Sequence, residues 1–334
     1  MPAEASFPAM GSQAHVVVVG GPRTLPEQAR RRIEDYERRW SRFLPGSELS
    51  RLNAGTGRMH PVSEATWTLL QHLVAAWEGT DGRFDPTVLD ALRSAGYRNC
   101  FEPDNPQSVV GDLPDVDRPD RDRPDGDLPD GDLPGREPTD VEGGPAGAAP
   151  GCAAILFDPP ARSVLLPRGV RIDAGGLGKG LAADLVVGEL LASGAEGAMV
   201  NLGGDLRAAG NAGADAGWVV GIDNPFLADE ESYRVAFAAG AVATSSRLRR
   251  TWHTGGKRHH HLIDPATGRS SLSGLAGVTV IAAEAWWAEA VAKAAFLAGP
   301  IDGGDVVTKA GATGVLTGDD GTRQVLRGMA ELLV

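Results

Sequence analysis

The spacing of apolar positions before residue 100 predicts one strand and two helices. Residues 15–19 are dominated by valine, a pattern typical of a short buried strand. Residues 26–42 predict a helix with proline in its first turn. Residues 65–78 predict a second, amphipathic helix in which apolar side chains recur at helical spacing. We expect its Trp67 and Trp77 to be core residues rather than ligand contacts.

Beyond residue 150 the pattern changes to short strands separated by a few helices. Residues 154–157 and 163–166 predict a hairpin around the turn Asp158-Pro-Pro. Helices are predicted at residues 178–193 and 286–297. Further strands are predicted at residues 198–202, 218–222, 233–237 and 278–282. This mixture favours an α+β fold over a regular series of βαβ units.

The segment between these two regions, residues 103–150, has a different composition. It holds thirteen acidic residues, four arginines and ten of the chain's 23 prolines. Such a segment buries too little apolar surface to offset its ordering entropy, so it predicts a disordered acidic insertion. Its Asp-x-Asp spacings do not fit a calcium-binding loop, because the closing glutamate is absent. We therefore expect residues 1–102 and 151–334 to be two parts of one domain.

Charge and composition exclude several classes of function. The formal net charge is −12, of which the insertion carries −9, and no basic stripe suited to nucleic acid appears elsewhere. No apolar run is long enough to insert into a membrane, and the first residues do not resemble a secretory signal, so we expect a cytoplasmic protein. Cys100 and Cys152 flank the insertion, and two free thiols are favoured over a disulfide.

Two glycine-rich turns follow predicted strands. The first, at residues 171–184, has glycines that let backbone approach a ligand, and it opens a helix whose first turn contains Lys179. Its spacing matches neither a Walker loop nor a dinucleotide fingerprint. Spacing alone leaves phosphate binding and a tight structural turn equally open. The second turn, at residues 200–205, is a similar close-approach turn.

A third segment, residues 256–268, contains three adjacent histidines followed by Asp264-Pro-Ala-Thr-Gly. Neighbouring side chains in a strand point to opposite faces, so a three-histidine metal site is not expected. A single histidine near a carboxylate is a better candidate for a proton acceptor. The Asp264 segment is also a standard turn, so a purely structural role stays open.

Six motifs occur in a recognisable order along the chain. They are Phe43-Leu-Pro-Gly-Ser-Glu-Leu-Ser-Arg-Leu-Asn53, Gly82-Arg-Phe-Asp-Pro-Thr-Val88, the glycine turn at Asp173, Asn201-Leu-Gly-Gly-Asp205, Ala243-Thr-Ser245 and His261-Leu-Ile-Asp-Pro-Ala-Thr-Gly268. Together they resemble the ApbE family of FAD:protein FMN transferases. The resemblance extends from about Met10 to Gly299 and skips only the insertion.

The resemblance implies a T-fold-like α+β protein that binds FAD, with magnesium at the pyrophosphate. It implies transfer of FMN to a Ser or Thr hydroxyl of an acceptor protein, with AMP leaving. His261 would be the base that takes the hydroxyl proton. Phe43 stands where the family commonly has tyrosine, which keeps stacking and loses a hydroxyl. The residues implied in FAD binding are Met10, Phe43, Phe84, Asp85, Asp173, Gly175, Gly176, Lys179, Thr244, Ser245, His261 and Asp264.

The last predicted helix departs from the family pattern. The family has Ala-Asp-Ala-Leu-Ala-Thr, whose Asp and Thr bind the metal together with a carbonyl of the first glycine turn. Here residues 288–293 read Ala-Glu-Ala-Val-Ala-Lys. Gly176 and Glu289 remain candidate metal ligands, but a lysine ammonium has no acceptor and cannot ligate Mg²⁺. We hypothesise that Lys293 occupies the place of the metal and acts in catalysis by neutralising the FAD pyrophosphate.

Other interpretations of this departure stay open. Glu289 and Lys293 are four residues apart, and they could form an exposed salt bridge on a helix of shifted register. Catalysis could be lost or repurposed, which would leave an FAD-binding protein. Ser246 and Arg247 favour that alternative, because they replace a glycine and a small or acidic residue of the family. A third possibility is an FAD pyrophosphatase with water as acceptor.

Overall fold

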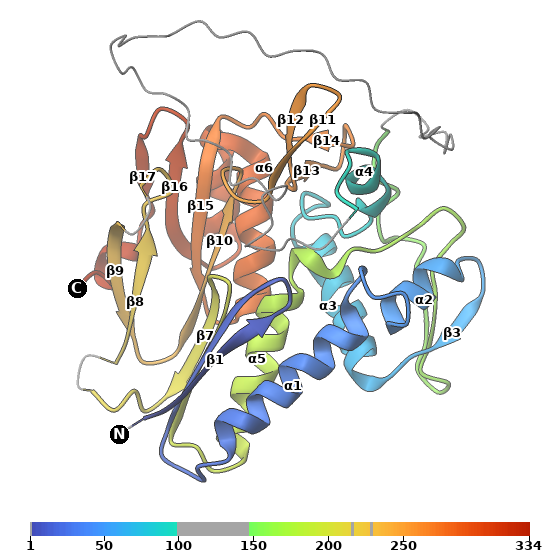
Figure 1. The fold of residues 1–334 in the computed structure, drawn as a ribbon. Helices are drawn as coiled ribbons and strands as arrows, with labels where there is room; N and C mark the ends of the chain where they lie inside the picture. The colour runs from blue at the N-terminus through green and yellow to red at the C-terminus, as the bar shows by residue number, and fades with distance from the viewer. Residues whose placement is uncertain (1, 99–146, 215–216, 228–229) are drawn as a thin grey trace, which may run out of the picture.

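An eight-stranded antiparallel sheet forms the centre of the computed structural model, which describes residues 2–98, 147–214, 217–227 and 230–334 (Figure 1). Its strands follow the order β1-β2-β6-β7-β10-β15-β16-β17. They are β1 (Ala3–Ala9), β2 (Ser12–Val19), β6 (Gly197–Leu202), β7 (Asp205–Gly210), β10 (Gly240–Ser246), β15 (Leu275–Ala282), β16 (Thr313–Gly318) and β17 (Arg323–Val325). The predicted strands at residues 15–19, 198–202 and 278–282 are confirmed.

Helices cover one face of this sheet, where α1 (Leu25–Trp40), α5 (Gly178–Ala192) and α6 (Ala285–Lys309) pack against the strands. The other described helices are α2 (Glu48–Ala54), α3 (Glu64–Gly79) and α4 (Leu89–Ser94), with short 3-10 turns at Ala174–Gly176 and Met329–Glu331. The main core joins side chains from both sides of residues 99–146, including Trp40 and Leu70 before them and Val186 and Phe296 after them. The predicted α+β class is confirmed, as are the four long helices. Trp67 and Trp77 pack against the core, as predicted.

The opposite face of the sheet carries a two-stranded ribbon, β8 (Trp218–Asp223) and β9 (Glu231–Phe237). Successive side chains of a strand alternate between faces. In β10, Ala241 and Ala243 accordingly join the core under the helices, while Val242 joins a smaller cluster under the ribbon. The middle of the sheet is therefore buried on both faces.

Three small sheets complete the described fold. Their strands are β3 (Met59–Pro61) with β5 (Ser163–Leu165) and β4 (Leu156–Asp158), β11 (Thr251–Thr254) with β12 (Lys257–His260), and β13 (Ile263–Asp264) with β14 (Arg269–Ser270). The pairing of β4 with β5 confirms the predicted hairpin after Asp158.

Helix α6 is held in place from its N-terminus by a neighbouring helix. Its own N-cap residue, Glu284, makes no side-chain capping bond. Instead the carboxylate of Asp184 on α5 accepts the backbone N–H groups of Ala285 and Trp286, both at 2.9 Å. These N–H groups have no partner inside the helix, and a carboxylate there also suits the helix dipole. Asp184 thereby fixes the position of α6 relative to α5.

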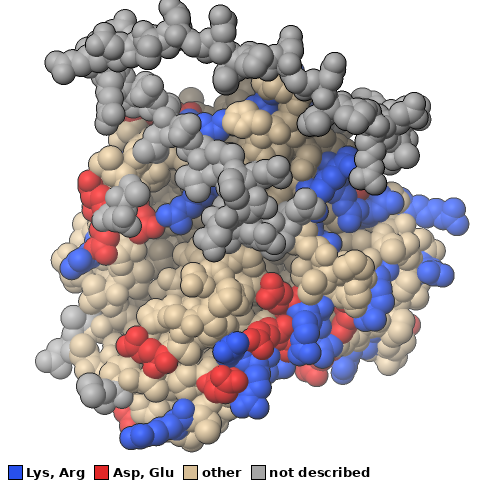
Figure 2. All heavy atoms as spheres, viewed as in Figure 1, with Lys and Arg blue, Asp and Glu red and all other residues tan. Residues whose placement is uncertain are grey.

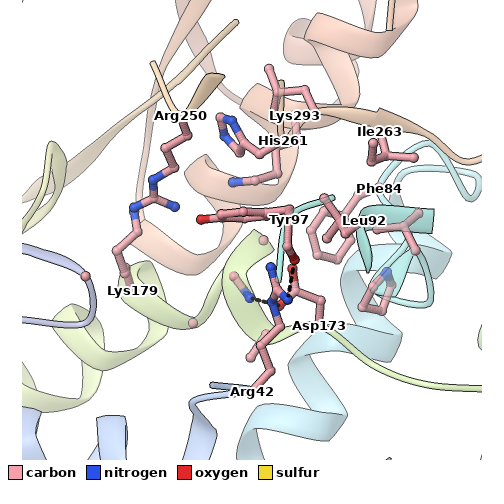
Figure 3. A pocket seen from close by; sticks show the side chains of 18 of the residues that line it. Arg42, Phe84, Leu92, Tyr97, Asp173, Lys179, Arg250, His261, Ile263 and Lys293 are labelled. Atoms are coloured by element: carbon pink, nitrogen blue, oxygen red, sulfur yellow. Dashed lines mark hydrogen bonds and ion pairs between the residues drawn. The ribbon is translucent and has the colours of Figure 1, made fainter. Parts of the chain in front are cut away.

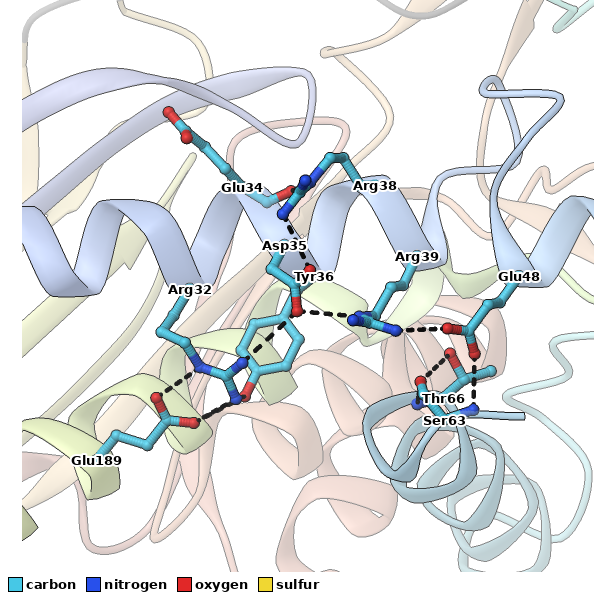
Figure 4. Close-up of polar contacts among 10 residues, drawn as sticks. All are labelled: Arg32, Glu34, Asp35, Tyr36, Arg38, Arg39, Glu48, Ser63, Thr66 and Glu189. Atoms are coloured by element: carbon cyan, nitrogen blue, oxygen red, sulfur yellow. Dashed lines mark hydrogen bonds and ion pairs between the residues drawn. The ribbon is translucent and has the colours of Figure 1, made fainter. Parts of the chain in front are cut away.

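A chain of ion pairs connects the N-terminal helices (Figure 4). Arg32 on α1 bonds the carboxylate of Glu189 on α5 through two nitrogens, each at 2.7 Å. Arg39, in the last turn of α1, contacts Glu48 at the start of α2 at 2.6 Å. Glu48 in turn accepts the N–H of Ser63, which caps α3. The chain segment that follows α1 is therefore anchored on two sides.

Basic and acidic side chains alternate along α1, as Figure 2 shows. Within the described ranges, no helix is both long and apolar enough to cross a bilayer. The predicted insertion (residues 103–150) lies almost wholly outside the described residues, as does Cys100. Cys152 is free and buried among the described residues. Because Cys100 lies outside them, the expectation of two free thiols stays a prediction.

Two glycines of α5 provide a paired test of the packing between α5 and α6. A Cβ on Gly180 would lie 2.4 Å from the carbonyl oxygen of Ala285, whereas a Cβ on Gly188 would meet nothing within 4 Å. We expect Gly180→Ala to lower the free energy of unfolding by about 1–3 kcal/mol. Gly188→Ala should raise it by up to about 1 kcal/mol through helix propensity. Urea unfolding measures both, and equal stability of the two variants would contradict this packing.

Candidate active site

Two cavities meet at one group of side chains between the sheet, α5 and α6 (Figure 3). The first cavity lies toward α1 and α4, and the second lies between the sheet and the β8–β9 ribbon. Residues that line both are Gly175, Lys179, Arg250, His261 and Lys293. This shared wall places two lysines, an arginine and a histidine at the junction of the two cavities.

The first cavity has an aromatic side. Phe43 and Tyr97 line it and meet edge to face, with ring centroids 5.9 Å apart. The guanidinium of Arg42 lies 4.2 Å from the centroid of Phe43 and 4.7 Å from that of Tyr97. Arg42 is in turn held by Asp173 at 3.1 Å, and Met10 reaches the same cavity from the turn between β1 and β2. Such a lining suits a flat aromatic ligand.

The first glycine turn closes tightly against this aromatic side. The carboxylate of Asp173 accepts the N–H of Gly175 at 3.2 Å and thereby begins the 3-10 turn. A Cβ added to Gly176 would lie only 2.6 Å from the ring of Phe84. Glycine is therefore needed there for the backbone and the ring to share the cavity wall.

A buried ionic cluster stands beside the turn. Lys179, in the first turn of α5, contacts the carboxylate of Asp205 at the start of β7. Glu289 on α6 accepts the N–H of Gly180 at 2.9 Å, and its other oxygen lies 3.1 Å from the ammonium of Lys293 and 3.7 Å from that of Lys179. Two lysines from different helices thus share one carboxylate.

Burial controls the charges of this cluster. It lowers the pKa of Lys179 to about 7, against the opposing pull of Glu289. Burial also disfavours the charged form of Glu289, but Lys293 and Lys179 hold its pKa below the ordinary value. The side chains of Glu289 and Lys293 are 2% and 16% exposed. The alternative of an exposed surface salt bridge is therefore wrong.

The predicted metal residues lie close to this cluster without forming a suitable ligand set. Gly176 lines the first cavity and Glu289 the second, but both carboxylate oxygens of Glu289 already contact N–H or ammonium donors. Across the described ranges, no group of three or more His, Cys, Asp or Glu side chains is placed to hold a metal ion. Mg²⁺ requires several oxygen ligands, and a lysine beside it would repel it. The donors present do not fit a divalent cation at Glu289.

His261 faces the junction as a neutral ring. Burial lowers its pKa well below the ordinary value, and the positive charges of Arg250 and Lys293 add to this effect. Its Nδ1 is buried and has no hydrogen-bond partner among the described residues. The same holds for the hydroxyls of Ser245 and Ser232, which line the second cavity together with His261. Unpaired buried polar atoms call for a partner from outside the chain.

The three adjacent histidines have separate surroundings. His259 stacks on Trp252, with centroids 6.1 Å apart. His260 donates its Nε2 hydrogen to the carbonyl of Ser271 at 2.9 Å, and its Nδ1 accepts the N–H of Leu262. Only His261 lines the cavities described here.

The remaining predicted site residues divide between the cavities and the turns. Asp85 lines the first cavity, and burial raises its pKa. One of its carboxylate oxygens accepts hydrogen bonds from the N–H and the hydroxyl of Thr87. Thr244 lines the second cavity and shares a hydrogen bond with Thr279 at 2.9 Å. The carboxylate of Asp264 is used inside its own turn, by Ala266 and Thr267, and Asp264 lines neither described cavity.

Sequence reasoning missed four residues that shape this site: Arg42, Tyr97, Asp205 and Arg250. Of these, only Asp205 belongs to a motif recognised in the sequence, because it ends the second glycine turn. The others lie in segments whose patterns predict no ligand contact, because their role depends on how distant loops meet.

Comparison with known proteins identifies the family of the chain. The sequence profile of the ApbE family matches residues 10–316. The chain belongs to the ApbE family. Its fold matches the crystal structure of the ApbE protein from Thermotoga maritima with a TM-score of 0.80 and 27% identity, covering 99% of both chains. The flavin transferase ApbE from Vibrio cholerae shares the fold at a TM-score of 0.74 and 22% identity, covering 100% and 99% of the two chains.

Curated relatives in the ApbE family carry the name FAD:protein FMN transferase. One from Vibrio cholerae is 27% identical over 284 residues, which cover 83% of this chain and 75% of the relative. One from Treponema pallidum is 31% identical over 156 residues, which cover 44% and 43%. These relatives extend the resemblance beyond individual motifs.

His260 predicts how stability depends on pH. Burial lowers its pKa to about 4, whereas an unfolded histidine binds a proton near pH 6.5. The folded-state pKa is lowered, so the stabilisation is complete above pH 6.5 and is lost as the pH falls toward 4. Between pH 7 and 5 we expect the free energy of unfolding to fall by about 2 kcal/mol through this histidine.

Urea unfolding at both pH values tests this expectation with His260→Gln, which should lose that part of the pH dependence. His15→Gln is the control, because His15 is 42% exposed. An unchanged pH dependence in His260→Gln would contradict the assignment.

Proposed function

We propose that this ApbE-family chain is an FAD:protein FMN transferase, which moves FMN from FAD to a Ser or Thr hydroxyl of an acceptor protein and releases AMP. The observation that carries the proposal is the shared wall of the two cavities. A row of cations and a neutral histidine there separates an aromatic cavity from a polar one. The reaction joins a dinucleotide, which has flat rings and a charged pyrophosphate, to a hydroxyl nucleophile. The two reactants need these two environments side by side. The names of the curated relatives support the same activity.

FAD would lie in the first cavity. One of its flat ring systems would stack among Phe43, Tyr97 and Phe84, beside the guanidinium of Arg42. Its pyrophosphate would then reach the junction, where Lys179 and Lys293 project. Both ammonium groups can donate hydrogen bonds to phosphate oxygens while they still contact Glu289.

Lys293 would take the place that a metal ion has in the family pattern. The carboxylates of Glu289 and Asp205 hold the two lysines at the junction, so little reorganisation is needed when the phosphates arrive. Charge neutralisation would therefore come from fixed ammonium groups. FAD binding and transfer should then be independent of divalent cations.

His261 would act as the general base. The acceptor hydroxyl oxygen attacks the phosphorus of the FMN half, and the bond from that phosphorus to the AMP phosphate oxygen breaks. The hydroxyl proton passes to His261 and AMP leaves with the electron pair of the broken bond. His261 can accept the proton because its lowered pKa keeps it neutral at neutral pH.

The acceptor segment would enter through the second cavity. Its hydroxyl and backbone groups would supply the partners that Ser232, Ser245 and His261 lack within the described chain. This route keeps the nucleophile and FAD on different sides of the shared wall.

Mass spectrometry of an acceptor protein incubated with FAD tests the activity and its metal dependence together. We expect a covalent FMN adduct and free AMP in the presence of EDTA. A Glu289→Asp/Lys293→Thr double variant, which restores the pair found in the family pattern, should lose adduct formation in EDTA and regain it with Mg²⁺. Lys309→Thr, an exposed lysine at the end of the same helix, is the matched control and should behave as the wild type.

The other outcomes decide between the alternatives. Wild-type transfer that requires Mg²⁺ would overturn the role given to Lys293. FMN and AMP without an adduct would indicate a pyrophosphatase, and tight FAD binding without turnover would indicate a binding protein.

Ser232 tests the acceptor route separately. Ser232→Phe should narrow the second cavity and raise the KM for the acceptor about tenfold, the loss expected for about 1.4 kcal/mol of binding. The dissociation constant of FAD should stay unchanged, because Ser232 does not line the first cavity. Ser232→Ala is the size control. Equal losses of FAD and acceptor binding in Ser232→Phe would place FAD in the second cavity instead.

A further inference from the structure

Arg250 lies at the junction of the two cavities, immediately before β11. Its side chain points toward Lys179, near His261 and Lys293 (Figure 3). Its positive charge contributes, after burial, to lowering the pKa of both Lys179 and His261. Arg250 is therefore close enough to act on a group held between them.

Among the residues that the structure describes, no carboxylate pairs with the guanidinium of Arg250. Nearby Arg247 pairs with Asp319 at 2.7 Å, and Arg249 pairs with Asp223 at 3.1 Å. Within the part of the chain that the structure describes, Arg250 makes no ion pair or hydrogen bond of its side chain. By contrast, Lys179 contacts the carboxylates of Asp205 and Glu289, and Lys293 contacts that of Glu289. Arg250 thus supplies the net positive charge of the junction.

The backbone of Arg250 is in an unfavourable conformation. Its φ is +53°, in the left-handed region that costs a residue with a Cβ about 1–2 kcal/mol. Glycine or asparagine would fit this position with less strain. Strained backbone of this kind is enriched at functional sites, and at Arg250 the strained residue also has its side chain in the wall of both cavities. The left-handed turn directs Arg250 into the junction, while the adjacent Arg249 is exposed.

We propose that Arg250 is a catalytic residue that contacts the phosphoryl group in transfer and stabilises the negative charge of the transition state. This role rests on the proposed FMN transfer. The covalent step is unchanged: the acceptor oxygen bonds to phosphorus, AMP departs, and His261 takes the proton. Arg250 neither gives nor takes a proton, and its five N–H donors suit the equatorial phosphate oxygens. Lys179 and Lys293 would bind the pyrophosphate of FAD in the ground state. The positive charge of Arg250, which no described carboxylate compensates, would then act on the negative charge that develops in the transition state.

Arg250→Gly separates this role from a structural one, because it removes the side chain and relieves the strain. We expect its midpoint of thermal unfolding to equal or exceed that of the wild type by up to about 2 °C. The kcat for adduct formation should fall about 100- to 1,000-fold, with little change in the FAD dissociation constant. Guanidinium ion at a non-denaturing concentration should partly restore the rate. The acid limb of the pH–rate profile should move to higher pH, because a positive charge near His261 is lost.

Arg162→Gly is the matched control. Arg162 also has a positive φ, +44°, but it is exposed in the turn between β4 and β5. This variant should keep or gain stability and transfer FMN at the wild-type rate. A kcat for Arg250→Gly within threefold of wild type, or a clear drop in its unfolding midpoint relative to Arg162→Gly, would overturn the role of Arg250. Absence of an adduct from the wild-type protein would overturn the proposed function, and this role with it.

Discussion

The carboxylate of Glu289 is the interaction on which the rest of the site depends. It is almost completely buried, and an isolated carboxylate there would be strongly destabilising. Three donors compensate it: the Gly180 N–H at the start of α5 and the ammonium groups of Lys179 and Lys293. One side chain of α6 therefore fixes Lys293 and, together with Asp205, Lys179. The bond to Gly180 forms only because that glycine allows α5 to approach the beginning of α6.

The charges of the junction follow from this arrangement. Two carboxylates accompany two lysines, and this near balance makes burial of four ionisable groups tolerable. His261 stays neutral among the surrounding cations, and Arg250 adds charge without a counterion in the described chain. In the proposed function an anionic substrate group would complete the balance. The site would then bind phosphate through its own cations, in place of the metal ion implied by the family pattern.

Local sequence patterns predicted which segments form helices and strands better than they predicted which of these segments pack together. The long helices and the valine-rich β2 follow from apolar spacing, since such periodicity survives in any packing. Strands β7 and β10 were missed because each has only one large apolar residue, and the burial of their alanines and, in β10, of Ser and Thr depends on tertiary contacts. For the site, spacing along α6 placed Glu289 and Lys293 on one face. Their contact with Lys179, and the positions of Asp205 and Arg250, depend on chain segments far apart in sequence.

The most direct test of the account is an equilibrium titration of the protein with FAD in EDTA and in Mg²⁺. If fixed lysines hold the pyrophosphate, the wild-type dissociation constant will be the same in both conditions, and Lys293→Met will bind more weakly in both. If FAD binds only when Mg²⁺ is present, a metal ion holds the phosphates, and the central role given to the lysines is contradicted.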